Sequence, residues 1–204
     1  MWPWTVLVAA LAGPTAQAPP PSAAWHGSAE VYTYLVPDDT NYAQPTVTAD
    51  RGRLRLEGRF NYEDRDTGSL WLGCNFGGGD ESWWALTPMV GGVFGNTTGV
   101  APGYKGWLSG RRLEFYSEGE FVIDTKSSSD SFFYNWSELT VAPLEWLRVG
   151  IVAQRTRVYQ TDRELQRGLI VGVSRGRVDL STSILNPDEA KPTVVVTVAF
   201  HFGG

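Results

Sequence analysis

The 204-residue sequence is poor in the residues that form disulfides and bind metal ions, and it has no long apolar run. Its single cysteine, Cys74, excludes an internal disulfide bond. His26 and His201 are the two histidines, and no cysteine or carboxylate spacing completes a metal-ligand set around them, so no metal site is predicted. No stretch approaches the roughly 20 apolar residues that a transmembrane helix needs.

Positive charge is also scarce in this sequence. The chain carries 17 Lys and Arg against 22 Asp and Glu, a net charge of -5, which argues against a nucleic-acid partner. Glycines at 77–79 and 91–95 are followed by neither a Lys-Ser/Thr pair nor a helical pattern, so they predict no phosphate loop and no cofactor. Aromatic residues are abundant, with 9 Trp, 8 Tyr and 9 Phe. Trp and Tyr gather at lipid–water boundaries in membrane proteins.

The N-terminus has the pattern of a secretory signal peptide. Residues 5–12 are apolar, and Ala16-Gln17-Ala18 forms an A-x-A cleavage site, although no Lys or Arg precedes the apolar core. We therefore expect a signal peptide at 1–18, a short Pro-rich lead at 19–23 and a single domain at 24–202. A cleaved signal of this kind takes the mature chain out of the cytoplasm.

Alternation of apolar and polar residues, rather than helical periodicity, runs through the mature chain. The alternating segments are about ten residues long, which is the length of a tilted membrane strand. Twelve strands are predicted, at 24–36, 44–50, 53–63, 67–77, 82–95, 101–109, 112–123, 131–141, 145–159, 165–174, 177–185 and 193–202. Ten strands remain possible if residues 82–109 pair differently.

Short turns alternate with longer polar connections between these segments. Two-residue turns are predicted at 51–52, 110–111 and 175–176, and longer connections at 37–43, 124–130 and 186–192. The short turns place apolar residues opposite each other, pairing Ala49 with Leu54, Leu108 with Leu113, and Val173 with Val178. This alternation favours an all-β, antiparallel up-and-down transmembrane β-barrel with both termini at the short-turn, periplasmic side.

The last predicted strand carries a further pattern. Positions 194, 196, 198, 200 and 202 are all Val or Phe, and they share one face of an extended chain. An aromatic residue that ends such a strand resembles the last strand of bacterial outer-membrane β-barrels, although Gly203 and Gly204 follow Phe202 here. The resemblance implies that this strand closes the barrel on the first strand and is recognised by the barrel-assembly machinery.

Three longer stretches resemble uncharacterised, porin-like β-barrel proteins of the bacterial outer membrane. They are LRLEGRFNYEDRDTGS (54–69), LTPMVGGVFGNTTGVAPGY (86–104) and FYNWSELTVAPLEWLRVG (133–150), and together they cover about a quarter of the chain. The resemblance implies a barrel surrounded by outer-membrane lipid, and it implies no activity.

Charged residues gather on the face that is expected to line the lumen of the barrel. A three-residue turn at 142–144 is expected to place Glu138 opposite Arg148. The predicted lumen residues are Glu57, Arg59, Glu114, Glu118, Glu120, Glu138 and Arg148. Opposite charges in a confined lumen should pair, and the surplus of carboxylates predicts cation preference if a pore exists. The sequence therefore predicts either a narrow channel for small polar solutes or cations, or a closed structural barrel of the envelope.

Two alternative functions fit part of the sequence. His26 and Ser28 form an H-x-S pair on one strand face, and Glu30 could orient the imidazole. The pair resembles the His/Ser pair of outer-membrane phospholipase A and of the lipid A deacylase, which implies a lipid hydrolase. His26 is expected near the periplasmic end, whereas those enzymes work near the outer leaflet. A soluble periplasmic β-sandwich that binds a ligand would show the same alternation.

Overall fold

The computed structural model describes residues 24–127, 130–158 and 164–203, and all of its regular elements are β-strands. The predicted signal peptide at 1–18 and the Pro-rich lead at 19–23 lie outside these described residues. Within the described ranges, no helix is long and apolar enough to cross a bilayer.

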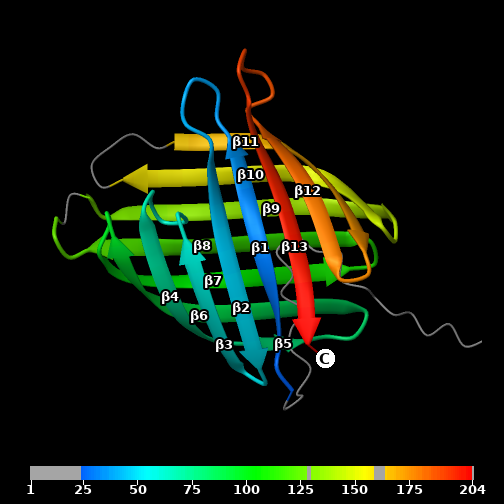
Figure 1. The fold of residues 1–204 in the computed structure, drawn as a ribbon. Coiled ribbons are helices and arrows are strands. Elements are labelled where there is room, and N and C mark those ends of the chain that lie inside the picture. Colours follow the sequence, from blue (N-terminus) through cyan, green and yellow to red (C-terminus); the bar gives the residue numbers. More distant parts are fainter. Residues whose placement is uncertain (1–23, 128–129, 159–163, 204) are drawn as a thin grey trace, which may run out of the picture.

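Thirteen strand segments form a single antiparallel sheet (Figure 1). They are β1 His26–Leu35, β2 Tyr42–Arg51, β3 Leu54–Phe60, β4 Thr67–Cys74, β5 Phe76–Gly78, β6 Ser82–Gly95, β7 Gly99–Gly110, β8 Leu113–Asp124, β9 Phe132–Leu144, β10 Leu147–Val158, β11 Glu164–Arg175, β12 Val178–Leu185 and β13 Thr193–Gly203. Both β4 and β5 pair with β6 in one continuous register, so together they are one interrupted strand. The sheet therefore has twelve strand positions, which confirms the predicted count.

The sheet closes because its last strand pairs with its first. In the β1–β13 pair, Ser28 lies opposite His201 and Val31 lies opposite Val198. Each strand otherwise pairs with its neighbours along the chain, which is the up-and-down topology predicted from the sequence. Closure leaves no free sheet edge, so the backbone groups of every strand have partners within the ring.

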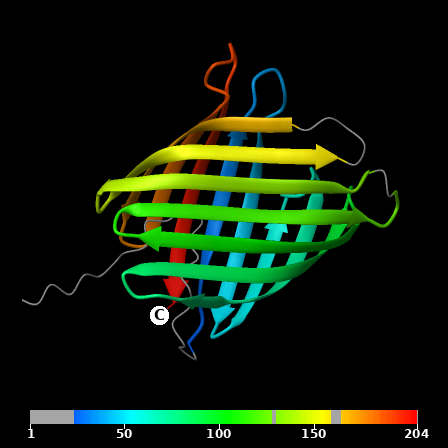
Figure 2. The same cartoon turned by 180° about the vertical axis from the view of Figure 1, so that it is seen from behind.

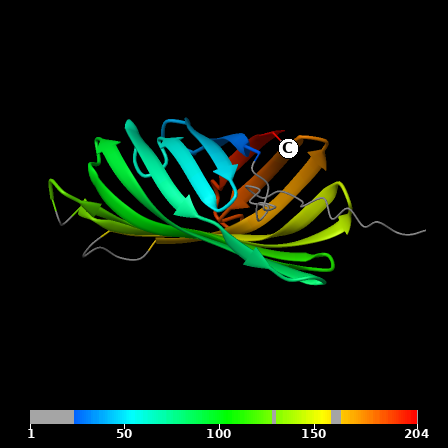
Figure 3. The same cartoon turned by 90° about the horizontal axis from the view of Figure 1, so that it is seen from below.

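The closed ring is flattened rather than round. Figures 1 and 2 show that β1–β3 and β13 run steeply across one wall, whereas β6–β10 cross the opposite wall in a nearly transverse direction. Figure 3 shows these two walls lying close together, one above the other. Side chains that project inward from opposite walls can therefore meet across the lumen.

The outer face is apolar and the inner face is largely polar. In β13, Val198 and Phe200 are 47% and 48% exposed, whereas Val195 and Ala199, which point inward, are 1% and 3% exposed. Every strand contributes at least one exposed large apolar side chain to the outer face. Soluble proteins rarely expose a continuous apolar surface of this extent. The fold is that of a transmembrane β-barrel, and it excludes the β-sandwich alternative.

The order of short and long connections agrees with the prediction. Turns between β2 and β3, β7 and β8, β9 and β10, and β11 and β12 consist of two residues each and lie at the end where β1 begins and β13 finishes. Longer connections, such as 36–41, 61–66 and 186–192, lie at the opposite end. We call these two ends the short-turn end and the long-loop end.

The register at the three predicted two-residue turns was wrong by two residues. The structure pairs Arg51 with Leu54, Gly110 with Leu113, and Arg175 with Val178. Each turn therefore starts one residue later than predicted, with Gly52, Arg111 or Gly176 as its first central residue. These residues have φ angles of 58°, 56° and 64°, and a positive φ at this position is what a type II′ turn requires. A shift of two residues preserves which face each side chain occupies.

The β9–β10 register was also predicted incorrectly. The turn is formed by two residues, Glu145 and Trp146, and a bulge follows between Leu147 and Val149. As a result, Glu138 lies opposite Val152 and not opposite Arg148. β9 extends three residues beyond the predicted end at 141, and β10 begins two residues after the predicted start at 145.

The outward face of β13 gives a direct test of membrane insertion. Val198→Arg, near the middle of β13, should lower the free energy of unfolding by about 2–4 kcal/mol, because a guanidinium at the bilayer midplane is costly. Val178→Arg lies beside a short turn at the rim and should cost only about 0–1 kcal/mol. Urea unfolding of the mature protein in lipid vesicles would measure both values, and equal costs would contradict this placement of the bilayer.

Candidate functional site: a charged and closed lumen

The structure directs all seven predicted lumen residues toward the interior of the barrel. Glu57 and Arg59 come from β3, Glu114, Glu118 and Glu120 from β8, Glu138 from β9 and Arg148 from β10. Six of the seven are buried, and Glu114 is half-buried. Inward alternation on neighbouring strands therefore concentrates charge in a space that the flattened walls shield from solvent.

Ion pairs cross the lumen between strands that are not neighbours in the ring. Arg59 Nη1 of β3 lies 2.7 Å from Glu120 Oε2 of β8 across the lumen. Within β3, Arg59 Nε also lies 2.6 Å from Glu57 Oε1. Lys105 Nζ of β7 lies 2.9 Å from Glu57 Oε1 and 3.5 Å from Glu118 Oε2. We call these five residues the lumen clamp, because they connect one flattened wall to the other.

Aromatic rings hold the guanidinium of Arg59 in place. Its Cζ lies 4.3 Å from the centre of the Tyr62 ring and 4.4 Å from the centre of the Trp71 ring. Glu63 adds a carboxylate oxygen at 3.6 Å. A Cβ on Gly91 of β6 would stand 2.5 Å from the Trp71 ring, so glycine at that position makes room for the indole. These contacts limit the rotamers that are open to Arg59.

Tyr62 adds a second link across the lumen from the 61–66 connection. Its hydroxyl donates a hydrogen bond to Glu118 Oε1, and the Tyr116 hydroxyl donates to Glu118 Oε2 at 2.7 Å. Burial, together with the negative charge of Glu118, raises the pKa of Tyr62 well above its usual range. The phenol therefore stays protonated and remains a donor.

A second ion pair lies beside the lumen clamp. Arg148 Nη1 is 2.9 Å from Glu138 Oε2, and Trp136 Nε1 donates to Glu138 Oε1 at 2.8 Å. The predicted partnership of Glu138 and Arg148 is thus present, although it is diagonal rather than directly across the strands. A Cβ on Gly172 would stand 2.6 Å from Arg148 Nε, so this glycine accommodates the guanidinium.

Carboxylates outnumber cations around the lumen clamp. Glu57 Oε2, Glu63 Oε2 and Glu120 Oε1 are buried and have no hydrogen-bond partner in the structure. Their Asp and Glu neighbours do not form a metal site, since no group of three His, Cys, Asp or Glu among the described residues could hold a metal ion. The interior thus keeps an acidic surplus, which gives it a negative electrostatic potential.

Side chains fill the space around the ion pairs. Apolar side chains from several strands pack in the lumen as two clusters, of which the larger consists of Tyr34, Ala85, Trp107, Tyr116, Trp136, Val152, Leu185 and Val195. The pocket between Arg59, Tyr62, Trp71 and Glu118 encloses no space that would hold a water molecule. In this conformation, the part of the lumen that these residues line is closed.

Several lumen residues were missed by the sequence analysis. Lys105 shares the inward face of β7 with Ala101 and Trp107, and exposed or half-buried residues lie between them. This period of two was the signal that could have identified Lys105 as a lumen residue. Arg55 pairs with Asp50 of the neighbouring strand at 3.0 Å. Glu63 comes from a connection, where alternation has no meaning, so periodicity could not have predicted its inward position.

The residues of the hydrolase alternative are arranged differently from a serine–histidine pair. Ser28 Oγ donates to Glu30 Oε1 at 2.6 Å and lies 2.9 Å from Thr48 Oγ1. His26 lies at the start of β1, opposite Gly203 and Asp50. A hydroxyl whose hydrogen is donated to a carboxylate is not activated by an imidazole base. The contacts of Ser28 therefore give no support to the His26–Ser28 hydrolase.

Comparison with known proteins identifies the fold. No protein-family model matches the chain, and no curated protein matches its sequence. The structure is similar to that of a KdgM porin, with a TM-score of 0.63, a sequence identity of 9%, and coverage of 86% of this chain and 99% of the porin chain. At this level of identity, the similarity establishes the architecture alone.

Removing Arg59 should destabilise the barrel strongly. Arg59→Ala leaves Glu57 and Glu120 buried without their guanidinium, and the loss of one partner from a buried ion pair costs about 3–5 kcal/mol. The matched control is Arg65→Ala, which removes a guanidinium from an exposed pair with Asp39 and should cost about 0–1 kcal/mol. Urea unfolding in vesicles would give both free energies. Similar small values would show that the clamp adds nothing to stability.

Proposed function

We propose that this protein is a porin-type channel of the bacterial outer membrane that passes small cations and is held closed by the lumen clamp. The observation that carries the proposal is the pair of cross-lumen bridges from β3 to β7 and β8. The apolar outer face and the architecture shared with a KdgM porin support the membrane and the channel parts of the proposal.

The clamp would act as a gate made of side chains. Arg59 and Lys105 each bind carboxylates on two different strands, so rotation of either side chain away from the lumen centre breaks a link between the walls. The carboxylates that remain would attract cations, since acidic groups that line a pore favour cations over anions. Among the described residues, this opening requires only side-chain rotation, because the clamp residues project from strands of the wall.

The outer-membrane location would follow from features at the two ends of the chain. A signal peptide at 1–18 would direct export, and the strand at 193–202, which closes the ring, would be recognised by the barrel-assembly machinery. Outer-membrane lipid would then surround the apolar face. These partners are expected from the fold and from the sequence pattern.

A second candidate is a closed barrel with a structural role in the envelope. The filled interior favours it, because small barrels are often packed with side chains and conduct nothing. The two candidates differ in what happens when the clamp is weakened. A channel gains conductance, and a structural barrel loses only stability.

Opening of the clamp should appear as conductance in a planar bilayer. The wild-type protein should be silent or nearly so, whereas Arg59→Ser with Glu120→Ser should conduct, because the double change removes one cross-lumen pair without leaving either partner alone. The control is Asp50→Ser with Arg55→Ser, which removes a pair between adjacent strands of one wall and should stay silent. If the folded clamp variant is also silent, the structural-barrel function is correct.

Selectivity of the opened barrel should depend on the remaining carboxylates. Adding Glu118→Gln to the opened variant should weaken cation preference, because it removes a negative charge that faces the same space. Reversal potentials in a salt gradient would measure the change. Anion preference before this substitution, or a preference that Glu118→Gln leaves unchanged, would disprove the assignment of the lumen as a cation path.

A further inference from the structure

Six arginines occupy three turns at the short-turn end of the barrel. They form the pairs Arg51 and Arg53, Arg111 and Arg112, and Arg175 and Arg177. Arg111 and Arg112 form one two-residue turn, and each other pair consists of the last residue of a strand and the second residue of the turn that follows. All six side chains are exposed. We call these six residues the arginine collar. None of them belongs to the lumen clamp.

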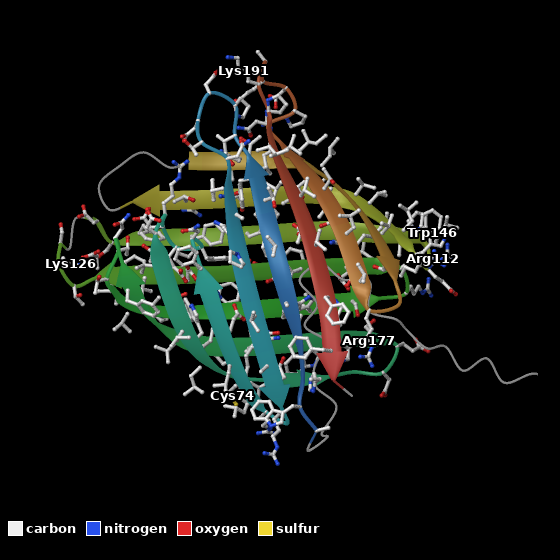
Figure 4. The ribbon with its side chains drawn as sticks, viewed as in Figure 1. Cys74, Arg112, Lys126, Trp146, Arg177 and Lys191 are labelled. Carbon is white, nitrogen blue, oxygen red and sulfur yellow. The ribbon has the colours of Figure 1, made fainter. Side chains whose placement is uncertain are left out.

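The collar lies directly beside the apolar outer face. Leu54, Leu113 and Val178, which follow the three turns, are 38%, 55% and 46% exposed. Figure 4 shows Arg112 and Arg177 at the rim of the short-turn end, with Trp146 next to Arg112. The collar guanidinium groups are therefore placed where the lipid tails end and the headgroups begin.

Aromatic residues lie at the same level of the barrel as the collar. The Arg51 guanidinium lies 5.8 Å from the centre of the Trp25 ring, and the Arg53 guanidinium lies 5.5 Å from the centre of the Phe76 ring. Trp146, in the β9–β10 turn, is 53% exposed. Trp side chains favour the headgroup level, so Trp25 and Trp146 place the collar at the membrane surface.

The opposite end of the barrel has a different charge character. Exposed acidic residues of the 36–41, 61–66 and 186–192 connections are Asp38, Asp39, Asp64, Asp66, Asp188 and Glu189. Several cations there are already paired, such as Arg65 with Asp39 and Lys191 with Asp38. At the short-turn end, the collar outnumbers the acidic turn residues Asp80, Glu81 and Glu145. The two rims therefore present opposite charge to the two membrane surfaces.

We propose that the arginine collar binds the phosphate groups of anionic phospholipids in the leaflet at the short-turn end. A guanidinium is planar and donates two parallel hydrogen bonds to phosphate oxygens, which makes Arg well suited to headgroup phosphates. Its aliphatic stem can lie along the apolar belt while the charged end reaches the headgroup. The proposal requires insertion in a bilayer and does not depend on whether the lumen conducts.

Binding of anionic lipid to the collar should be electrostatic, and each arginine should add to it. A basic side chain at an anionic membrane surface changes the lipid preference by up to about fivefold at low ionic strength. The effect weakens as salt rises, because the screening length falls to roughly 8 Å at physiological ionic strength. A neutral zwitterionic lipid offers no net charge, so it gains little from the collar.

The test is the lipid that the full-length mature protein retains after extraction from vesicles with equal amounts of phosphatidylglycerol and phosphatidylcholine. Mass spectrometry would give the ratio of the two retained lipids. The collar variants are Arg111→Gln with Arg112→Gln, Arg175→Gln with Arg177→Gln, and all six Arg→Gln together. The matched control removes four exposed cations from the long-loop end: Arg65→Gln, Lys126→Gln, Arg167→Gln and Lys191→Gln.

The wild type should retain phosphatidylglycerol in excess, each collar pair should lower the ratio several-fold, and the control should leave it unchanged. Arg→Lys changes in the collar should keep part of the preference, since charge remains while the planar fork is lost. Heat-modifiable gel migration would confirm that each variant is folded, and the two-residue variants suffice if the sixfold variant does not assemble. Equal ratios in wild type and collar variants, or an equal loss in the control, would overturn the proposal.

Inorganic phosphate in solution carries the same phosphate oxygens as a lipid headgroup, so it is tested separately as a ligand of the collar. If the collar recognises headgroups at a membrane surface, added inorganic phosphate should displace phosphatidylglycerol no better than chloride at equal ionic strength. Displacement by phosphate alone would identify a soluble anion as the ligand and would overturn the lipid assignment. Failure of the protein to enter phosphatidylcholine vesicles would instead contradict the membrane assignment on which both proposals stand.

Discussion

Pairing between the first and the last strand is the interaction on which the rest of this structure depends. A bilayer offers no hydrogen-bond partner to a free strand edge, so an open sheet of this length could not stay in lipid. The β1–β13 register, with Val31 opposite Val198, closes the sheet and fixes which residues face outward on every strand. It also brings Gly203 next to His26, so both ends of the described domain lie at the same rim.

Closure leads directly to a charged interior. Once the outer face is apolar, inward positions are the ones left for the ionisable residues of each strand, and flattening brings opposite walls within reach of single side chains. Arg59 and Glu120 then meet, although 61 residues separate them in the sequence. A buried ion pair adds little net stability over an apolar pair of the same size. The lumen clamp is therefore better explained by what it does to the lumen than by what it adds to stability.

The sequence was informative about faces and less informative about register. Alternation placed Glu57, Arg59 and Glu120 on the inner face, and connection length placed the termini at one rim, because both features depend on local chemistry. The turn at Arg51-Gly52 was predicted one residue too early, since a glycine can be either central residue of a hairpin turn and the pattern does not say which. The bulge after Leu147 left no recognisable signal at all.

Contacts across the lumen were beyond sequence reasoning for a different reason. Alternation says that Lys105 and Glu118 both point inward, but the distance between them depends on the cross-section of the ring. That shape depends on strand tilt and on the sizes of inward side chains, including the glycines at 91 and 172 that admit Trp71 and Arg148. The sequence therefore predicted which charged residues line the lumen, and the structure shows which of them form ion pairs.

Different parts of the protein hold the barrel together and close its lumen. Backbone pairing around the ring holds the fold in lipid, whereas the described side chains that close the interior project from the strands of the wall and from the 61–66 connection. Under the proposed channel function, rotation of these side chains would open the lumen while the ring stays intact. The collar arginines lie in or beside the short turns and their side chains are exposed, so these side chains can be changed without removing backbone pairs from the ring. The lumen clamp and the arginine collar are thus separate sets of residues, and neither of them supplies the backbone pairs that close the ring.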